Sequence, residues 1–484
     1  MMIFACKDSD CLRIMYCESR INCIFGAILR IKDMNIADLY HLYQAHPEVT
    51  TDSRRCPEGS MFFALKGDSF DGNQFAAKAL EAGSAIAVVD DASVVPAADD
   101  RYILVDDVLK TLQELAAYHR QQFEGPVLQV TGTNGKTTTK ELLAAVLSRR
   151  YNVLYTQGNL NNHIGVPLTL LRLRPGEHDI AIIETGANHP GEIAFLTNIV
   201  QPDYGLITNV GRAHLEGFGS FEGVKNTKGE LYDYLNQKAT ARIFVNESNF
   251  DLQDMLVKRD IDIDTDKCIT YAREQADTMP WLCEGNVVSC NPALRICWRP
   301  RYEALREVQT QLIGDYNLDN VLAAICVGLH FEVTPEQIDA ALTDYHPSLG
   351  RSEYRKTAHN ELIIDAYNAN LTSMLAALNN FQQILHKDKM VILGDMRELG
   401  EASFDAHCKV AEQAFCCGAQ TVWFVGDEFR KALTHCAQPK DVAVAIFADV
   451  QAVKDAIAQQ QPTGRLILIK GSNSTKLHQL PDLL

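Results

Sequence analysis

The stretch "VLQVTGTNGKTTTKELLAAVLS", residues 127–148, decides the fold of the central part of this chain. An apolar run leads into a glycine loop that ends in Lys-Thr, and an amphipathic helical pattern follows. Strand, glycine loop and helix in this order are typical of a loop that binds nucleotide phosphates. The usual spacing places four residues between the first glycine and the Gly-Lys pair, but only two separate Gly132 from Gly135. The loop is therefore either a degenerate phosphate loop or one of a different kind.

The residue types of this loop suit phosphate chemistry. Two glycines let the backbone turn several N–H groups toward a phosphate, and the N-terminus of the next helix adds partial positive charge. Lys136 would then reach the terminal phosphates, and the hydroxyl of Thr137 would bind magnesium. The alternative is a strand-to-helix turn that contains Gly and Lys by chance. The strand before the loop and the helix after it favour nucleotide binding, although the loop alone says nothing about the reaction.

Composition limits the classes of partner. The 484 residues are 46% hydrophobic and 22% charged, which is typical of a globular protein with room for about three domains. A net charge of −17 argues against a broad surface for nucleic acid or anionic lipid, so local donors must bind any anionic ligand. No apolar run approaches the roughly 18 residues of a membrane span. We therefore expect a cytoplasmic protein with no nucleic-acid partner and no membrane insertion.

The 14 cysteines include no CxxC pair, which argues against a metal or redox role. Four of them stand within the first 23 residues, a segment that lacks clear hydrophobic periodicity. An amphipathic helical pattern begins at Met34. We expect residues 1–33 to be a non-native or disordered extension upstream of a native start at Met34. The alternative is a small N-terminal appendage.

Three blocks of alternating strand and helix patterns follow, at residues 34–122, 123–346 and 347–484. The first carries short strands such as "AIAVVDD", and the second supplies "VLQVTG", "YNVLYT", "DIAIIETG", "YGLITNV" and "ARIFVN". Strands that are apolar on both faces indicate a mostly parallel sheet between helices. The third block, with "ELIIDAYNAN", "MVILGDM", "TVWFVGD" and "RLILIKG", predicts another doubly wound unit. The fold class is therefore α/β.

Two candidate metal ligands follow neighbouring predicted strands. Glu184 ends the strand in "IAIIETGANHPGEI", and His214 follows the strand in "LITNV". Both could converge near the magnesium ion that Thr137 would hold, because carboxylate and imidazole groups join divalent cations beside phosphates. The alternatives are a solvated carboxylate at a strand end and a capping or core histidine.

Several motifs, taken together and in order, resemble the Mur ligase family. They are "GTNGKTTT", "GNLNNHIGVPLTLL", "IETGANHPGEI", "AHLEGFGSFEGV", "NTKGELY", "GDYNLDNVLAA", "DAYNAN" and "LGDMRELG". In this family two residues between the loop's glycines are normal, so the loop is not degenerate. The resemblance runs from about residue 36 to the end. Within the family it is greatest to members that join D-alanyl-D-alanine to a UDP-N-acetylmuramoyl tripeptide.

The resemblance implies a small UDP-binding domain, a central P-loop ATPase domain and a C-terminal Rossmann-like domain. It implies an ATP-dependent amide ligation, in which two anions must be brought together. The tripeptide carboxylate would attack the γ-phosphate of ATP, and the amine of D-alanyl-D-alanine would then attack the acyl phosphate. Positioning and charge neutralisation by Lys136 and Mg²⁺ suit this chemistry. The resemblance also implies two Mg²⁺ ions. We expect a monomer.

The resemblance assigns the catalytic and nucleotide residues one by one. Residues of the ATP-phosphate loop are Gly132, Thr133, Asn134, Gly135, Lys136, Thr137 and Thr138. Thr137 and Glu184 match the first magnesium site, whereas His214 and Lys228 match the second. Lys228 matches a lysine that reacts with carbon dioxide to form an anionic carbamate; without the family it would be a solvated helix lysine. Asn317 and Asn320 match the adenine side, and Arg351, Asp365 and Tyr367 match residues that close on ATP.

Substrate residues are implied in the same way. Ser53 and Arg54 match the UDP-sugar site, where Arg suits bidentate binding of an anion, and a surface turn is the alternative. Asn159, Asn161 and Asn162 match a substrate-facing loop. The sequence departs from the family pattern at Tyr316, where His is frequent, at His163, where an acidic residue is frequent, and at Leu371, where Pro is frequent.

Two other functions fit parts of the pattern. One is a different ligase of the superfamily, which adds the third amino acid or glutamate to folate; "GNLNNHIGVPLTLL" and "AHLEGFGS" argue against it. The other is a catalytically silent, Mur-like regulatory protein. The residues that argue against that function are Lys136, Thr137, Glu184, His214 and Lys228.

Deletion of residues 1–33 is expected to leave stability and activity almost unchanged, because the segment has no pattern that could pack against the rest of the chain. The measurements are the melting temperature and the turnover of the shortened protein. A large drop in melting temperature would refute this expectation.

Overall fold

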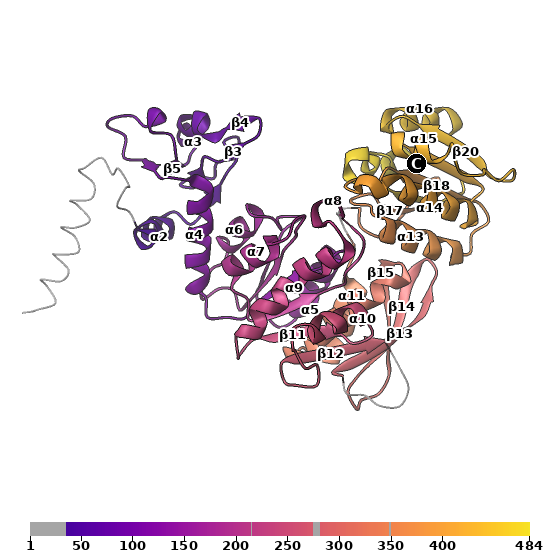
Figure 1. Ribbon diagram of the computed structural model, residues 1–484, viewed down its shortest axis with the longest axis horizontal. Coiled ribbons are helices and arrows are strands. Elements are labelled where there is room, and N and C mark those ends of the chain that lie inside the picture. The colour runs from indigo at the N-terminus through magenta and orange to yellow at the C-terminus, as the bar shows by residue number, and fades with distance from the viewer. Residues whose placement is uncertain (1–34, 214, 274–280, 348–349) are drawn as a thin grey trace, which may run out of the picture. The chain divides into compact units, whose positions relative to one another are not determined.

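The structure is a computed structural model, and it describes residues 35–213, 215–273, 281–347 and 350–484. The chain forms two compact units (Figure 1). Among the described residues, one unit consists of residues 35–124 and His163–Leu173, and the other lies within Gly125–Asn162 and Arg174–Leu484. The predicted extension, residues 1–33, lies outside the described residues. Within the described ranges, no helix is long and apolar enough to span a membrane.

A four-stranded parallel sheet forms the centre of the first unit, with the strand order β1-β2-β5-β6. Every residue of β2 and β5 is buried, which agrees with their apolar sequences. The strands are β1 (Val49–Thr50), β2 (Met61–Phe63), β5 (Ile86–Val89) and β6 (Tyr102–Leu104), with a hairpin of β3 (Lys66–Gly67) and β4 (Phe70–Asp71). The helices are α2 (Ile36–Ala45), α3 (Ala76–Glu81), α4 (Val108–Gln121) and α6 (Gly165–Leu170).

Helix α6 packs against α4 although most of its sequence neighbours belong to the second unit. The buried His119 of α4 forms a hydrogen bond of 2.8 Å with the carbonyl oxygen of Leu173. The hydroxyl of Tyr43, from α2, donates to the carbonyl oxygen of Leu171. These buried polar contacts tie His163–Leu173 to the first unit. The predicted division at 34–122, 123–346 and 347–484 stays a prediction.

A nine-stranded sheet dominates the first part of the second unit, with the order β15-β14-β13-β12-β11-β10-β7-β9-β8. Its strands are β7 (Val127–Thr131), β8 (Val153–Tyr155), β9 (Ile180–Glu184), β10 (Tyr204–Ile207), β11 (Arg242–Asn246), β12 (Cys268–Arg273), β13 (Cys283–Cys290), β14 (Ala293–Pro300) and β15 (Arg306–Ile313). Strands β7 to β11 pair in parallel, as the apolar runs predict, and β12, which the sequence pattern did not predict, continues the parallel pairing. Strands β13, β14 and β15 form an antiparallel meander that the sequence pattern did not predict, because β13 is buried only over its first three residues.

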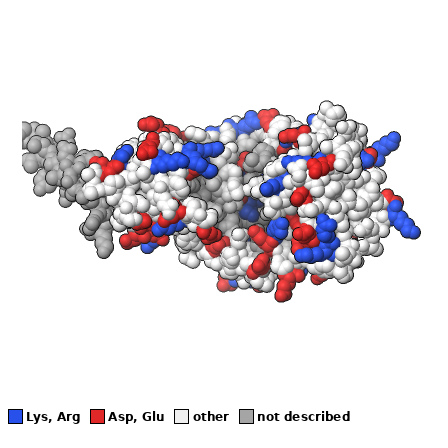
Figure 2. Space-filling model, turned by 90° about the horizontal axis from the view of Figure 1, so that it is seen from above, with Lys and Arg blue, Asp and Glu red and all other residues white. Residues whose placement is uncertain are grey.

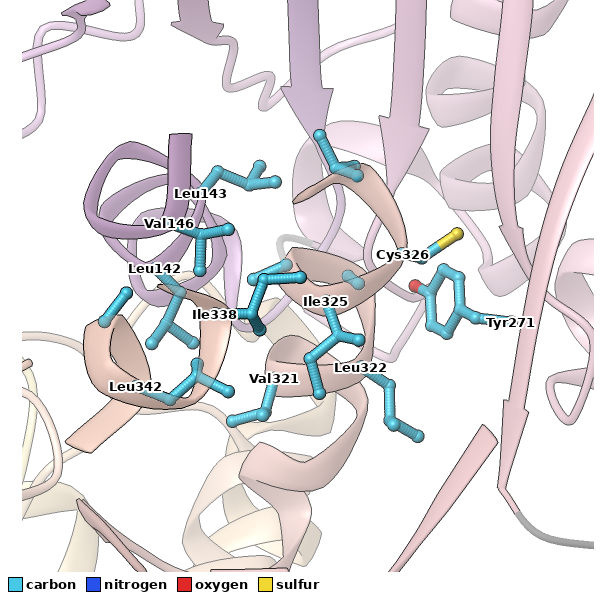
Figure 3. Close-up of a cluster of buried hydrophobic side chains, with 14 of the residues drawn as sticks. Leu142, Leu143, Val146, Tyr271, Val321, Leu322, Ile325, Cys326, Ile338 and Leu342 are labelled. Atoms are coloured by element: carbon cyan, nitrogen blue, oxygen red, sulfur yellow. The ribbon is translucent and has the colours of Figure 1, made fainter. Parts of the chain in front are cut away.

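Helices surround this sheet in the alternating pattern that parallel strands require (Figure 1). They are α5 (Lys136–Leu147), α7 (Glu192–Val200), α8 (Leu215–Phe218), α9 (Phe221–Gln237), α10 (Phe250–Val257), α11 (Leu318–His330) and α12 (Pro335–Asp344). Helix α11 is buried on nearly all sides, which its apolar sequence "LDNVLAAICVGLH" predicts. Figure 3 shows side chains of α5, α11 and α12 directed toward one another, with Tyr271 of β12 beside α11.

A six-stranded sheet follows in the same unit, with the order β16-β17-β21-β18-β19-β20. Only β16 runs antiparallel to its neighbour. The strands are β16 (Glu353–Lys356), β17 (Glu361–Asp365), β18 (Lys389–Gly394), β19 (Thr421–Val425), β20 (Ala443–Phe447) and β21 (Leu466–Lys470). The helices are α13 (Leu371–Gln383), α14 (Ser403–Cys416), α15 (Asp427–Ala432) and α16 (Val450–Gln460). The α/β class and the mostly parallel sheets are confirmed.

The distribution of charged side chains on the surface agrees with the acidic composition of the chain. On the face shown in Figure 2, basic and acidic side chains are interspersed among uncharged areas. A net charge of −17 is therefore not accompanied by a broad basic stripe on this face, and any anion must be bound by local donors.

The substitution Leu322→Ala should lower the free energy of unfolding of the second unit by about 2–5 kcal/mol, because Leu322 of α11 is fully buried in the core cluster, beside Gly285 of β13. Urea unfolding followed by tryptophan fluorescence measures this, since Trp281, Trp298 and Trp423 all lie in this unit. Leu305→Ala is the matched control, because Leu305 is 59% exposed and should change the free energy by less than about 0.5 kcal/mol. Equal effects of the two substitutions would contradict the assignment of the core.

Candidate active site

The glycine loop joins the buried strand β7 to helix α5. Both glycines have positive φ angles, 141° at Gly132 and 78° at Gly135. Neither position has room for a side chain, since an ideal Cβ would lie 2.1 Å from Oγ1 of Thr208 at Gly132 and 2.4 Å from Oδ1 of Asn320 at Gly135. No side chain caps the N-terminus of α5. The loop and the first turn of α5 can therefore present N–H groups to an anion.

Residues that follow β10 hold the loop in place. The N–H groups of Thr133 and Asn134 donate to the backbone oxygen and to Oδ1 of Asn209, at 2.9 and 3.0 Å. The hydroxyl of Thr208 donates to the carbonyl oxygen of Asn134 at 2.6 Å. Sequence reasoning missed both residues, and the signal was the polar "TN" directly after the apolar strand in "YGLITNV". These bonds make the loop a rigid element rather than a mobile turn.

Lys136, the first residue of α5, folds back onto the loop. Its Nζ donates to the carbonyl oxygens of Gly132 at 2.8 Å and Thr133 at 3.0 Å. Burial lowers the pKa of Lys136, although the charge of Glu184 opposes this effect. Nucleotide phosphates would supply oxygen acceptors in place of the two carbonyls, so the amine has a second arrangement available without being left unpaired.

A hydroxyl and a carboxylate meet at the end of strand β9. Thr137 and Glu184 are both buried, and Oγ1 of Thr137 donates to Oε1 of Glu184 at 3.1 Å. Asn161 donates to the same oxygen from its Nδ2 at 2.8 Å. The second oxygen, Oε2 of Glu184, is buried and has no hydrogen-bond partner. Because an unpaired buried carboxylate oxygen is costly, this atom favours a cation or donor in addition to the groups that the described residues supply.

This arrangement fits a small divalent cation. Mg²⁺ prefers oxygen ligands and commonly takes only one or two from the protein, with water and phosphate oxygens as the others. Glu184 Oε2 and the lone pairs of Thr137 Oγ1 are ligands of this kind. Among the described residues, no group of three or more His, Cys, Asp or Glu side chains could hold a metal ion. A cation here would therefore depend on phosphate oxygens for the rest of its ligands.

Lys228 lies on helix α9 and is 3% exposed. Its Nζ lies 3.5 Å from the carbonyl oxygen of Ala187 and 5.4 Å from the centre of the Phe218 ring. In the part of the chain that the structure describes, no carboxylate forms an ion pair with it. Burial, with a smaller contribution from the charge of Lys136, lowers the pKa of Lys228 to about 7. The predicted metal ligand His214 lies outside the described residues.

Asn317 and Asn320 are buried behind the loop. Asn320 donates from Nδ2 to Oδ1 of Asn317 at 2.8 Å and accepts at its own Oδ1 from the hydroxyl of Thr139, at 3.1 Å. Asn317 in turn donates to the carbonyl oxygen of Ile313 at 2.8 Å. The two asparagines therefore support helix α5 and the loop. The partners of their side chains in these hydrogen bonds are other residues of the chain.

The predicted residues of the third block lie near the ends of β16 and β17. The guanidinium carbon of Arg351 lies 3.7 Å from the centre of the Tyr367 ring, and Nε of Arg351 is buried without a partner. Asp365 forms an ion pair with the buried Lys470, its cross-strand neighbour on β21. Sequence reasoning missed Lys470, although a lysine that closes the apolar run "RLILIKG" was a usable signal. Asn370 links this block to the loop by donating to Oδ1 of Asn134 at 2.8 Å.

The predicted UDP residues lie in the first unit. Ser53 is half-buried, and Arg54 is exposed and forms an ion pair of 2.8 Å with Asp52. Hydrogen bonds from Arg54 lower the pKa of Asp52 to about 2. Arg54 is therefore fully charged and accessible, but a diphosphate would compete with Asp52 for it.

The three predicted asparagines of the substrate-facing loop differ in their surroundings. Asn159 and Asn162 are exposed, whereas Asn161 is partly buried and hydrogen-bonded to Glu184. The structure therefore brings Lys136, Thr137, Glu184 and Asn161 together at the ends of β7 and β9.

Sequence comparison matches the chain to Mur ligases over almost its whole length. The Mur ligase family catalytic domain matches residues 47–120, the Mur ligase middle domain matches residues 130–328, and the Mur ligase glutamate ligase domain matches residues 350–473. The UDP-N-acetylmuramoyl-tripeptide–D-alanyl-D-alanine ligase of Escherichia coli K12 is 36% identical over 89% of this chain and 92% of the relative. The protein of the same name from Bacillus subtilis 168 is 32% identical over 92% and 96%.

Solved structures agree with this match. A crystal structure of MurF from Acinetobacter baumannii has a TM-score of 0.78 and 29% identity, and the similarity covers 93% of this chain and 98% of that one. MurF ligase from Thermotoga maritima in complex with ADP has a TM-score of 0.76 and 25% identity over 91% and 97%. A folylpolyglutamate synthase from Mycobacterium tuberculosis shares the fold at 14% identity, with a TM-score of 0.57 over 78% and 94%.

The substitution Gly135→Ala should weaken ATP binding by about tenfold or more, because it adds a strained φ and a contact with Asn320 that the loop cannot relieve without moving. Calorimetric titration with ATP measures the effect. Gly176→Ala is the matched control, because its φ is also positive, at 86°, while nothing lies within 4 Å of the added Cβ. Unchanged ATP affinity in Gly135→Ala would show that the loop tolerates displacement.

Proposed function

This chain belongs to the Mur ligase family, and we propose that it joins D-alanyl-D-alanine to a UDP-N-acetylmuramoyl tripeptide with ATP, in the synthesis of peptidoglycan precursors. The observation that carries the proposal is the match to relatives of that name over about nine-tenths of both chains. The site geometry supports it, since the phosphate loop, Lys136 and the Thr137–Glu184 pair are assembled in the structure. A cytoplasmic location and a monomeric state stay predictions.

The reaction needs an activated carboxyl group. The tripeptide carboxylate would attack the γ-phosphorus of ATP, and ADP would leave. The D-alanyl-D-alanine amine would then attack the carbonyl carbon of the acyl phosphate, lose a proton and form the amide as inorganic phosphate departs. Because both the carboxylate and the triphosphate are anions, the chain must bring positive charge to their meeting point. The N–H groups at the start of α5 and the amine of Lys136 supply that charge.

Thr137 and Glu184 would hold one Mg²⁺ ion, which would neutralise phosphate charge when bound. The unpartnered Oε2 of Glu184 supports this assignment. His214 and the carbamate of Lys228 would be ligands of a second Mg²⁺ ion. Carbamate formation requires a neutral amine to attack carbon dioxide, and the buried Lys228, whose pKa is lowered to about 7, meets that requirement.

The remaining assignments follow the family pattern. Arg351, Asp365 and Tyr367 would close on ATP, and Ser53 and Arg54 would contact the UDP-sugar. Asn317 and Asn320 would act on the nucleotide through the loop that they brace, in addition to any contact with adenine. Asn159 and Asn162, both exposed, suit contacts with the tripeptide.

The proposal is tested with purified protein, ATP, Mg²⁺, D-alanyl-D-alanine and UDP-N-acetylmuramoyl tripeptides that carry either diaminopimelate or lysine at the third position. We expect phosphate release and a product with the mass of the pentapeptide. Lys136→Ala should reduce turnover by roughly two or more orders of magnitude. Release that requires glutamate or a dipeptide precursor would indicate another ligase of the superfamily, and no release under any condition would indicate a silent protein.

Lys228→Ala should lose ligation by roughly two orders of magnitude while it retains ATP binding, because it removes a metal-binding anion and leaves the phosphate loop intact. Turnover and ATP affinity are measured beside a sample of unaltered protein depleted of carbon dioxide, and a short-chain carboxylic acid is added to test for rescue. Lys225→Ala is the matched control, since Lys225 lies one turn away on α9 and pairs with Asp251 and Asp254 instead. Full activity in both Lys228→Ala and the depleted sample would reject the carbamate.

A further inference from the structure

We propose that Asn161 is a positioning residue for Glu184: its amide holds one carboxylate oxygen, so that the other is left to bind the cation. The family pattern places Asn161 in a substrate-facing loop together with Asn159 and Asn162, whereas its hydrogen bond points to a different role. The inference rests on the proposed function, because it presupposes that Glu184 is a metal ligand.

The hydrogen bonds of Glu184 are distributed unequally between its two oxygens. Oε1 accepts from Nδ2 of Asn161 at 2.8 Å and from Oγ1 of Thr137 at 3.1 Å. Oε2 is buried and accepts a hydrogen bond from no group among the residues that the structure describes. The backbone N–H of Glu184 donates to Oγ1 of Thr156 at 3.0 Å, which holds the end of strand β9. The carboxylate is therefore anchored through its backbone and through one oxygen only.

The chemistry of the two donors explains how this arrangement selects a cation. An amide nitrogen can only donate, so Nδ2 of Asn161 occupies Oε1 and does not compete as a ligand. Because the hydroxyl of Thr137 donates its proton to Oε1, both lone pairs of Oγ1 remain available to a metal ion. Oε1 already accepts from two donors. Oε2 of Glu184 and Oγ1 of Thr137 are therefore the oxygen atoms of these two residues that can still coordinate a cation. Removal of Asn161 would let the carboxylate turn and exchange its oxygens.

The position of Asn161 is itself determined by the strand that carries Glu184. The N–H of Gly186 donates to the backbone oxygen of Asn161 at 2.8 Å. The amide also lies over Gly186, where an ideal Cβ would be only 3.2 Å from Cγ and Oδ1 of Asn161. Asn161 is thus clamped to the residues after β9 by both its backbone and its side chain. Asn159 and Asn162 are exposed on either side of it.

The test measures cation affinity directly. Mn²⁺ is titrated into protein saturated with a non-hydrolysable ATP analogue, and free Mn²⁺ is followed by electron paramagnetic resonance. We expect Asn161→Leu, which keeps the size of the side chain without its donor, to weaken Mn²⁺ binding by roughly tenfold. Asn161→Ala should weaken it similarly, and provides the measurement if the leucine variant does not fold. In steady-state assays both variants should raise the Mg²⁺ concentration needed for half-maximal turnover and leave the KM for the tripeptide unchanged.

Two further variants distinguish the alternatives. Asn162→Ala should raise the KM for the tripeptide and leave Mn²⁺ affinity unchanged. Glu184→Gln should weaken Mn²⁺ binding; if it does not, the metal assignment in the proposed function is wrong, and this inference falls with it. If Glu184→Gln weakens Mn²⁺ binding while both Asn161 variants bind Mn²⁺ normally and raise only the KM for the tripeptide, the metal site stands and Asn161 is a substrate residue.

Discussion

One buried oxygen atom, Oε2 of Glu184, is the constraint around which the site is organised. Removing a carboxylate oxygen from water without a donor is unfavourable by several kcal/mol on the order-of-magnitude scale of buried charged groups. The parallel pairing of β7 and β9 places Val130 opposite Glu184, so the sheet itself fixes the height of the carboxylate beside the loop. Thr137 and Asn161 then occupy the other oxygen. The surrounding structure therefore favours the binding of a cation at Oε2, beside the phosphate loop.

The phosphate loop beside this carboxylate has little freedom to move. Gly132 and Gly135 are positions where a Cβ would collide with Thr208 and Asn320, and the N–H groups of the loop are directed by bonds to Asn209. Rigid support of this kind reduces the reorganisation that a phosphate must induce when it binds. The side chain that changes partners is Lys136, which has carbonyl oxygens to bind until phosphate oxygens replace them.

Three buried or partly buried lysines of the second unit differ in their polar partners, and this difference suits them to different chemical roles. Lys470 is neutralised by Asp365 across adjacent strands, and Lys136 has two carbonyl acceptors. Among the described residues, Lys228 has a weak contact of 3.5 Å with a carbonyl oxygen and lies over an aromatic ring. Burial in such surroundings makes the charged form of the amine unfavourable. This suits conversion to a carbamate better than a purely structural role.

The amino-acid sequence by itself determined the α/β class, the parallel strands β7 to β11, the phosphate loop and the candidate ligands Thr137 and Glu184, because apolar runs and glycine spacing are local properties. Only the tertiary structure decided that Asn161 binds Glu184 from 23 residues away, that Asn320 braces α5 from 181 residues away, and that Lys470 pairs with Asp365 across 105 residues. It also decided that His163–Leu173 packs with the first unit and that β13 to β15 form an antiparallel edge. The physical reason is that a side chain's partner depends on strand register and helix packing, which bring together residues whose spacing along the chain carries no signal.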